Sequence, residues 1–158
     1  MRVKVHIRYT GYLVMNLQAL ETAIRAFLEC RDDRPLTFPR PGDKETEETW
    51  LTKYVYFGPL VKEFNNSLIT DTERERYTLD DGVVEIRNAF AHGRLFSDFE
   101  RLPARLWKFG DENSQGKIDV EFSQLLTPEW LLKNHNFVVR EKQKVHSCFN
   151  SRKYKGLR

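Results

Sequence analysis

Several residue patterns are scarce in this 158-residue chain, and each scarcity excludes a class of protein. The two cysteines, Cys30 and Cys148, are too few and too far apart for a disulfide framework or a zinc site. The four histidines show neither the close pairing nor the neighbouring cysteines and carboxylates of a metal centre, so we expect no metal and no cofactor. The eight glycines are scattered, so the sequence contains no glycine-rich phosphate-binding loop.

The sequence also lacks long apolar runs. No stretch approaches the length needed to cross a membrane, and the first residues lack the apolar core and cleavage site of a signal peptide. A hydrophobic content of 40% and a charged content of 31% are typical of a globular protein. The length predicts a single domain over residues 1–158 with a sizeable core. We therefore expect a cytoplasmic protein without a membrane partner.

The charge is distributed unevenly along the chain. The net charge is +3, but residues 140–158 hold seven Lys or Arg against one Glu. The remainder, residues 1–139, holds nineteen basic against twenty-two acidic residues. A basic tail from about residue 150 suits contact with a nucleic-acid backbone, although a terminal basic run is also typical of a solvated chain end.

The first part of the chain predicts one long helix. Apolar residues from Leu13 to Leu28 recur at spacings of four and three, which is typical of a buried helical stripe. This helix is expected to start near Gly11 and to end by Cys30. Before it, the alternation over residues 3–9 favours a strand, with a backward extension of the helix as the alternative.

A loop and a second helical region are expected next. Residues 31–45 contain three prolines and many charges, which predicts a loop. Residues 47–68 predict a helical region that is broken near Gly58 and Pro59, because proline favours the first turn of a new helix. Residues 70–77 are interpreted as a charged link.

In the C-terminal half, the spacing of apolar residues changes from a helical period to the alternation of a strand. Short apolar-rich runs, the second of them strictly alternating, predict a β-hairpin at about residues 105–123. A last helix is expected to open at Thr127-Pro128-Glu129, where an N-cap is followed by proline and an acid in the first turn. These patterns predict a mainly α fold with a small β-hairpin before the C-terminal helix.

The most informative segment is VVEIRNAFAHGRLF, residues 83–96, which sets an arginine and a histidine five residues apart near the end of an apolar helix. Thr78 is the expected N-cap of this helix, and Gly93 is the expected glycine just past its C-terminal end. The apolar positions are spaced by four, three and four residues, as in a helix packed on a core: Leu79, Val83, Ile86 and Phe90.

The geometry of a helix separates the arginine from the histidine. At 100° per residue, Arg87 and His92 differ by about 140° around the axis and by about 7.5 Å along it. Asn88 and His92 are four residues apart and share a face. This spacing suits a groove built by two copies of the helix, each of which contributes the same three side chains around one ligand.

The chemistry of these side chains suits RNA cleavage without a metal. Guanidinium offers a rigid fork of donors that matches phosphate oxygens, and imidazole exchanges protons near neutral pH. His92 would move protons at the 2′-hydroxyl and the leaving oxygen, while Arg87 would neutralise the phosphorane. The structural interpretation stays open, because a histidine before a capping glycine commonly bonds the last carbonyls and a helical arginine commonly lies in solvent.

The segment resembles the signature of HEPN domains, a family of helical nucleotide-binding modules. Active members of that family carry Arg, a polar residue that is often Asn, three further residues and His at the end of a long helix. Arg87, Asn88 and His92 match these positions. The resemblance implies an antiparallel helical bundle and a homodimeric endoribonuclease, commonly a toxin or an antiviral effector. Within it, Arg and His are catalytic and the polar residue supports them.

The resemblance also bears on partners. RNA is the implied substrate, and an antitoxin or another regulatory protein is a possible partner. One branch of the family carries a tyrosine two residues after the histidine that is modified by adenylylation, whereas this chain has Arg94 there. The residues expected to contact RNA or its phosphates are Arg94, Lys142, Lys144, Arg152 and Lys153.

Two alternatives to the nuclease remain. A non-catalytic HEPN module would bind RNA, a nucleotide or a partner protein, with an affinity that depends on Arg87 and falls with salt. A plain helical interaction protein would use Arg87 and His92 only to hold two subunits together.

Overall fold

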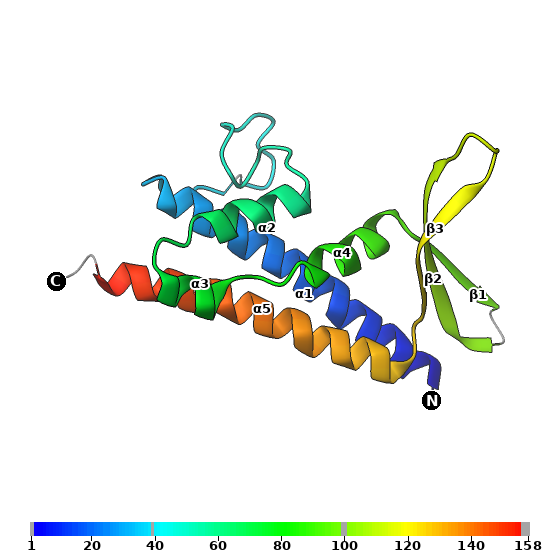
Figure 1. Cartoon of the computed structure of the whole chain (residues 1–158). Helices are drawn as coiled ribbons and strands as arrows, with labels where there is room; N and C mark the ends of the chain where they lie inside the picture. The colour runs from blue at the N-terminus through cyan, green and yellow to red at the C-terminus, as the bar shows by residue number, and fades with distance from the viewer. Residues whose placement is uncertain (1, 39, 99–100, 156–158) are drawn as a thin grey trace. The chain divides into compact units, whose positions relative to one another are not determined.

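The computed structural model describes residues 2–38, 40–98 and 101–155. The fold is mainly α, as expected, and the described residues also form one small three-stranded antiparallel sheet. The order of the elements (Figure 1) is α1 (Arg2–Arg31), α2 (Phe57–Asn66), α3 (Asp71–Tyr77), α4 (Gly82–His92), β1 (Arg94–Asp98), β2 (Arg101–Glu112), β3 (Ile118–Leu125) and α5 (Pro128–Lys155).

The chain divides into two compact units, each built from two separate stretches. Unit 1 comprises residues 1–17 and 82–138, and therefore holds the first part of α1, α4, the sheet and the first part of α5. Unit 2 comprises residues 18–81 and 139–158, with the rest of α1 and α5 together with α2 and α3. The expectation of one domain over residues 1–158 stays a prediction.

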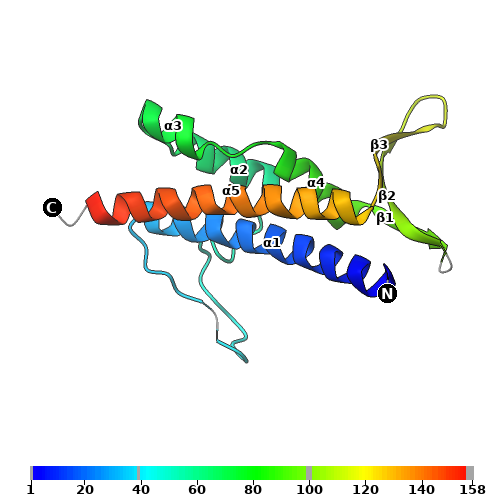
Figure 2. The same cartoon turned by 90° about the horizontal axis from the view of Figure 1, so that it is seen from below.

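Unit 1 packs helices and sheet around a common apolar core. Helix α4 leads into the sheet and α5 leads out of it, while α1 and α5 run in the same direction (Figures 1 and 2). The antiparallel helical bundle expected from the HEPN resemblance stays a prediction. The buried apolar residues of this unit are Leu13, Leu17, Val83, Ile86, Ala89, Ala104, Leu106, Leu126, Leu131 and Val138.

The start of the chain is helical, which corrects the strand favoured for residues 3–9. Helix α1 begins at Arg2, and its buried stripe extends backwards from Leu13 to His6, two helical turns earlier. Two apolar residues of the alternation that suggested a strand are instead exposed, Val5 at 37% and Ile7 at 65%. Packing of the long helix has therefore overridden the local β-branched pattern. Burial of His6 lowers the pKa of its imidazole below the ordinary value.

The predicted hairpin is present but belongs to a larger sheet. Strands β2 and β3 pair antiparallel, with Arg105 opposite Leu125, and a turn at Asn113–Lys117 joins them. Gly116 in this turn has φ of 71°, a conformation that favours glycine. Strand β1 was not predicted from the sequence; it pairs with β2 and makes the order β1-β2-β3.

Unit 2 differs from the predicted helical region over residues 47–68. Helix α2 begins only at Phe57, with Pro59 in its first turn, whereas residues 47–56 form turns and extended chain. Two side chains of α1 hold this segment. Arg25 donates hydrogen bonds to the carbonyls of Trp50 (2.9 Å), Lys53 (3.0 Å) and Val55 (3.1 Å). The buried Glu29 accepts the Trp50 N–H at 2.6 Å. Because these side chains supply hydrogen-bond partners to the backbone groups of the segment, the segment does not need helical hydrogen bonds.

The charged link predicted over residues 70–77 is also wrong, because it contains α3. Thr70 and Glu73 form a capping box in which each side chain bonds the backbone N–H of the other residue. The buried apolar residues of unit 2 are Leu20, Ile24, Phe27, Leu28, Phe57, Leu60, Val61, Phe64, Leu68, Leu79, Val145 and Cys148.

Helix α5 replaces most of the basic tail expected from about residue 150. It opens as predicted, with the Thr127 hydroxyl accepting the Trp130 N–H at 3.2 Å, and it continues to Lys155. The rest of that tail, residues 156–158, lies outside the described residues. Across the part of the chain that the structure describes, no helix combines the length and apolar character required to span a membrane.

Candidate functional site

The motif helix α4 lies in unit 1 and is shorter than predicted. Helix α4 begins at Gly82. Thr78, the expected N-cap of this helix, is instead the C-cap of α3, and its hydroxyl donates to the Arg74 carbonyl. The buried positions of α4 are Val83, Ile86 and Ala89. This stripe faces the core, so the remaining positions of the last two turns are left at least partly open to solvent.

The last two turns of α4 present the three motif side chains. Arg87 and Asn88 are half-buried, and His92 is exposed as the final helical residue. Because α4 is continuous over these positions, Arg87 and His92 are about 140° apart around the axis, whereas Asn88 and His92 lie one turn apart on the same side. Arg87 and His92 of a single α4 helix therefore cannot both contact the same small ligand.

Gly93 fixes the end of α4 against the sheet. The helix stops before it as predicted, but Gly93 does not have the left-handed conformation expected of a glycine at that position. Glycine is required for space instead. A Cβ at Gly93 would lie 2.1 Å from the Ala89 carbonyl oxygen and 2.9 Å from the Trp107 carbonyl oxygen. The His92 end of α4 is thereby held directly against β2.

We expect Gly93→Ala to destabilise this junction. The added methyl group has no space between Ala89 and Trp107, so α4 must shift away from β2, at a cost of about 1–3 kcal/mol in the free energy of unfolding. Chemical denaturation of both proteins measures this cost. Gly11→Ala is the matched control, because a Cβ there meets nothing within 4 Å. Equal stability of the two variants would contradict the steric role of Gly93.

The first residue of β1, Arg94, belongs to a group of aromatic and basic side chains that was not predicted from the sequence. Its guanidinium lies 5.5 Å from the ring centroid of Phe109 on β2. The ring of Phe96 lies 4.8 Å from that of Trp107, which lies 6.3 Å from that of Phe109. We call this group, with Arg105 beside it, the aromatic face. The sequence signal from which this face could have been predicted is the i, i+2 spacing of Arg94 with Phe96 and of Trp107 with Phe109, because such residues lie on the same side of a strand.

The other basic residues predicted to contact RNA lie on α5, in unit 2. Lys142 and Lys144 are half-buried, and the Lys144 ammonium donates to the Thr78 carbonyl and to the Glu141 carboxylate, both at 2.9 Å. Lys153 lies in the last turns of α5, and its side chain is outside the described part of the structure. The structure thus places Arg94 beside the motif within unit 1, while the α5 residues belong to the other unit.

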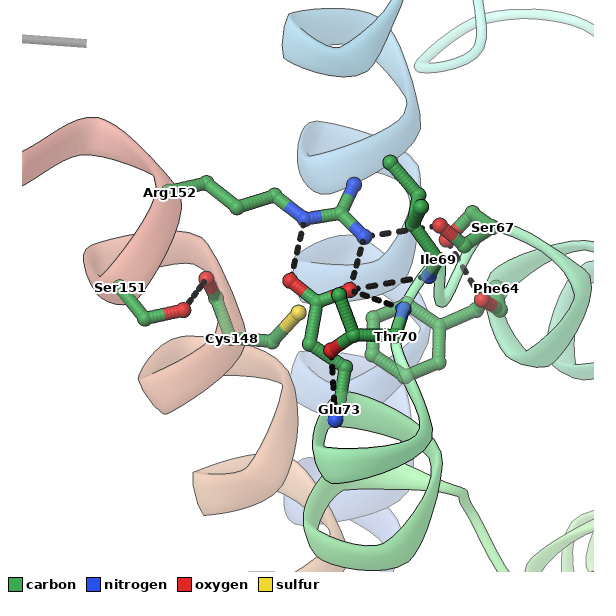
Figure 3. Close-up of polar contacts among 8 residues, drawn as sticks. All are labelled: Phe64, Ser67, Ile69, Thr70, Glu73, Cys148, Ser151 and Arg152. Carbon is green, nitrogen blue, oxygen red and sulfur yellow. Dashed lines mark hydrogen bonds and ion pairs between the residues drawn. The ribbon is translucent and has the colours of Figure 1, made fainter. Parts of the chain in front are cut away.

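Arg152 is held by contacts within unit 2 (Figure 3). Its Nε and Nη2 atoms donate to the two carboxylate oxygens of Glu73, at 3.3 Å and 3.1 Å, and Nη2 also donates to the Ser67 carbonyl at 2.7 Å. The hydrogen bond from Arg152 lowers the pKa of Glu73, against the opposing effect of burial. Arg152 therefore joins α5 to α3, and its role as an RNA contact stays a prediction.

Comparisons with models of protein families, with curated proteins and with solved structures find no match to this chain. In the described residues, no group of three or more His, Cys, Asp and Glu side chains is arranged to hold a metal ion. Of the two cysteines, both within the described residues, Cys30 is half-buried and Cys148 is buried, and they are not joined in a disulfide. The candidate site is therefore defined by α4 and by the sheet to which Gly93 attaches it.

Proposed function

We propose that this chain is a metal-independent endoribonuclease of the HEPN type that cleaves RNA at a site shared by two subunits. The observation that supports this function is the placement of the motif. Arg87, Asn88 and His92 lie on the last two turns of α4, and the histidine is exposed at the helix end. The resemblance of these residues to the HEPN signature adds RNA as the substrate.

Each motif side chain has a distinct role in this proposal. Arg87 binds the scissile phosphate and stabilises its transition-state charge, because guanidinium matches two phosphate oxygens and stays protonated. His92 acts as general base or general acid. Asn88 shares a helical face with His92 and orients the phosphate or the imidazole.

A second copy of the chain completes the site. The angle of about 140° between Arg87 and His92 keeps them from one small ligand on a single helix, so two α4 helices must contribute. The first part of α1 supports self-association, because Ile7 and Met15 lie two turns apart and are 65% and 67% exposed. The two side chains lie about 80° apart around the axis, and exposed apolar side chains within one sector of a helix are typical of an interaction surface.

The proposed reaction uses the 2′-hydroxyl of RNA as the nucleophile. A base removes its proton as the oxygen attacks the neighbouring phosphorus, and the bond from phosphorus to the 5′-oxygen breaks as an acid protonates that oxygen. The products are a 2′,3′-cyclic phosphate and a 5′-hydroxyl. No oxidant, reductant or metal ion takes part in these steps.

Incubation of the pure protein with end-labelled single-stranded RNA in a chelator tests this function. We expect cleavage of RNA with cyclic phosphate ends and no cleavage of the DNA of the same sequence, because DNA lacks the nucleophile. Cleavage of that DNA, or intact RNA after long incubation at high enzyme concentration, would overturn the proposal.

The non-catalytic alternative predicts a different result in the same assay. The observation that favours it is the aromatic face, because neighbouring aromatic and cationic side chains suit nucleic-acid binding with or without cleavage. Such a module would retain RNA on a filter and leave it intact. A role as toxin or antiviral effector and an antitoxin partner are further implications of the HEPN resemblance, and a cytoplasmic location stays the expectation from the lack of a signal peptide and of long apolar runs.

A further inference from the structure

The aromatic face is continuous across two paired strands of unit 1. Arg94 pairs with Trp107 and Phe96 pairs with Arg105, and directly paired residues in an antiparallel sheet project from the same side. Phe109 follows Trp107 at the next position on that side of β2. Five side chains from β1 and β2 thus form one surface, with three aromatic rings and two guanidinium groups.

The central ring of this surface is held in place. The Trp107 indole N–H donates to the Ser123 hydroxyl at 2.7 Å, and Arg105 donates to the same hydroxyl at 3.1 Å. The rings of Phe96 and Phe109 are tilted against that of Trp107, with centroids 4.8 Å and 6.3 Å from its own. A ring fixed in this way binds a ligand with little loss of conformational entropy.

The composition of this surface favours a nucleic acid as its ligand. Phe96 is 47% exposed, although it is a large apolar side chain on an edge strand. Its charged neighbours, Arg94 and Arg105, are both cationic, and none of the five residues of the aromatic face is acidic. One exposed ring and two half-buried rings flanked by guanidinium groups match bases and phosphates, which alternate along a single strand.

The surface is also adjacent to the candidate site. Gly93 separates His92 at the end of α4 from Arg94 at the start of β1, and it lies against the Trp107 carbonyl. Arg94, the first residue of this surface, therefore follows His92 by two residues at the junction of α4 with β1. This adjacency lies within unit 1.

We propose that the aromatic face binds single-stranded RNA by stacking bases on Phe96 and Trp107 and by pairing phosphates with Arg94 and Arg105. The choice of RNA over DNA rests on the proposed function, whereas stacking applies to either polymer. The surface supplies affinity and positions the strand for the motif on α4, and it takes no part in the chemical step.

The test measures binding separately from cleavage. A fluorescent single strand of about 12 nucleotides, within the site sizes of such surfaces, carries 2′-O-methyl riboses so that it cannot be cut, and anisotropy reports its affinity. We expect Phe96→Ala to weaken binding by about 5- to 150-fold, the loss of one stacked base. Phe96→Tyr keeps a ring and should bind like the parent.

The matched control is Leu95→Ala. Leu95 neighbours Phe96 on β1 and is 59% exposed. It pairs with Leu106, and its side chain therefore projects from the other side of the sheet. We expect its affinity to stay within about twofold of the parent, well below the effect of losing a stacked base. Equal losses for Leu95→Ala and Phe96→Ala, or no RNA binding by the parent, would overturn the proposal.

Arg94→Gln gives a second measurement. Loss of one phosphate contact should reduce the slope of log affinity against log salt by about 0.7 for a single strand. An unchanged slope would remove Arg94 from the binding surface.

Failure of this proposal differs from failure of the proposed function. If the protein cleaves RNA but Phe96→Ala does not change RNA binding, the nuclease proposal stands and the proposal that the aromatic face binds RNA is overturned, in favour of another ligand such as a protein. Binding that depends on Phe96, without cleavage of unmodified RNA, would keep the aromatic face and overturn the nuclease.

Discussion

Replacing His92 with alanine is expected to slow RNA cleavage by about 10²–10⁴-fold, the usual contribution of general acid–base catalysis. His92 is exposed at the end of α4, so the truncation removes the proton carrier without opening a cavity. Because the group acts on the reacting atoms, the loss should fall on kcat, with KM nearly unchanged. Single-turnover cleavage of labelled RNA in chelator measures the rate.

The matched control for this prediction is His146→Ala. His146 is also an exposed helical histidine, but it lies on α5 in unit 2 and is not part of the motif. Its variant should cleave at the rate of the parent. A His92→Ala protein that cleaves as fast as His146→Ala would contradict the catalytic role of His92. Circular dichroism of both variants checks that the helices remain.

Replacing Arg152 with methionine is expected to lower the free energy of unfolding by about 3 kcal/mol, near the lower end for breaking a buried ion pair. Methionine retains the apolar stem but leaves the Glu73 carboxylate without its cation and the Ser67 carbonyl without that donor. Glu73 is buried, and Arg152 keeps 24% of its side chain exposed, which moderates the loss. Denaturant unfolding at neutral pH measures the change.

The same ion pair predicts how this loss depends on pH. The bond from Arg152 lowers the pKa of Glu73 below its ordinary value of 4.5. A carboxyl group with a lowered pKa stabilises the folded state at pH values above its pKa in the unfolded chain. This contribution disappears as the pH falls through its pKa in the folded protein. The stability difference between the parent and Arg152→Met should therefore be full at pH 7 and shrink below pH 4.5.

The matched control for the Arg152 prediction is Arg74→Ala. Arg74 pairs with Asp71 at 2.9 Å on α3, but the two side chains are 57% and 99% exposed. Exposed pairs of this kind contribute about 0–1 kcal/mol. A loss for Arg152→Met no larger than that for Arg74→Ala would show that the Glu73 contact adds little to stability.

The features predictable from the sequence were those with a local signal. Alternation identified the β2–β3 hairpin, and the Thr-Pro-Glu run located the start of α5. The apolar spacing around Arg87 predicted the helix that carries the motif. Each signal lies within a few residues, because helix and strand periods and caps depend on near neighbours. The capping box at Thr70–Glu73 was also local, and α3 could have been found from it.

The errors came from segments in which a local pattern competes with distant packing. Residues 3–9 alternate like a strand, but the stripe that buries His6 and Leu13 makes them helical. Residues 47–56 have helical composition, yet Arg25 satisfies three of their carbonyls from α1. Neither outcome has a signature within the segment itself.

The sequence by itself determined that α4 exists, that it carries Arg87, Asn88 and His92 near its end, and that a helix separates the arginine from the histidine. The tertiary structure alone decided the surroundings of that helix. It set Gly93 against Trp107, assembled the aromatic face from two strands, and paired Arg152 with Glu73, 79 residues earlier in the chain. Periodicity is fixed by neighbouring residues, whereas these contacts depend on how remote segments pack, which no local spacing encodes.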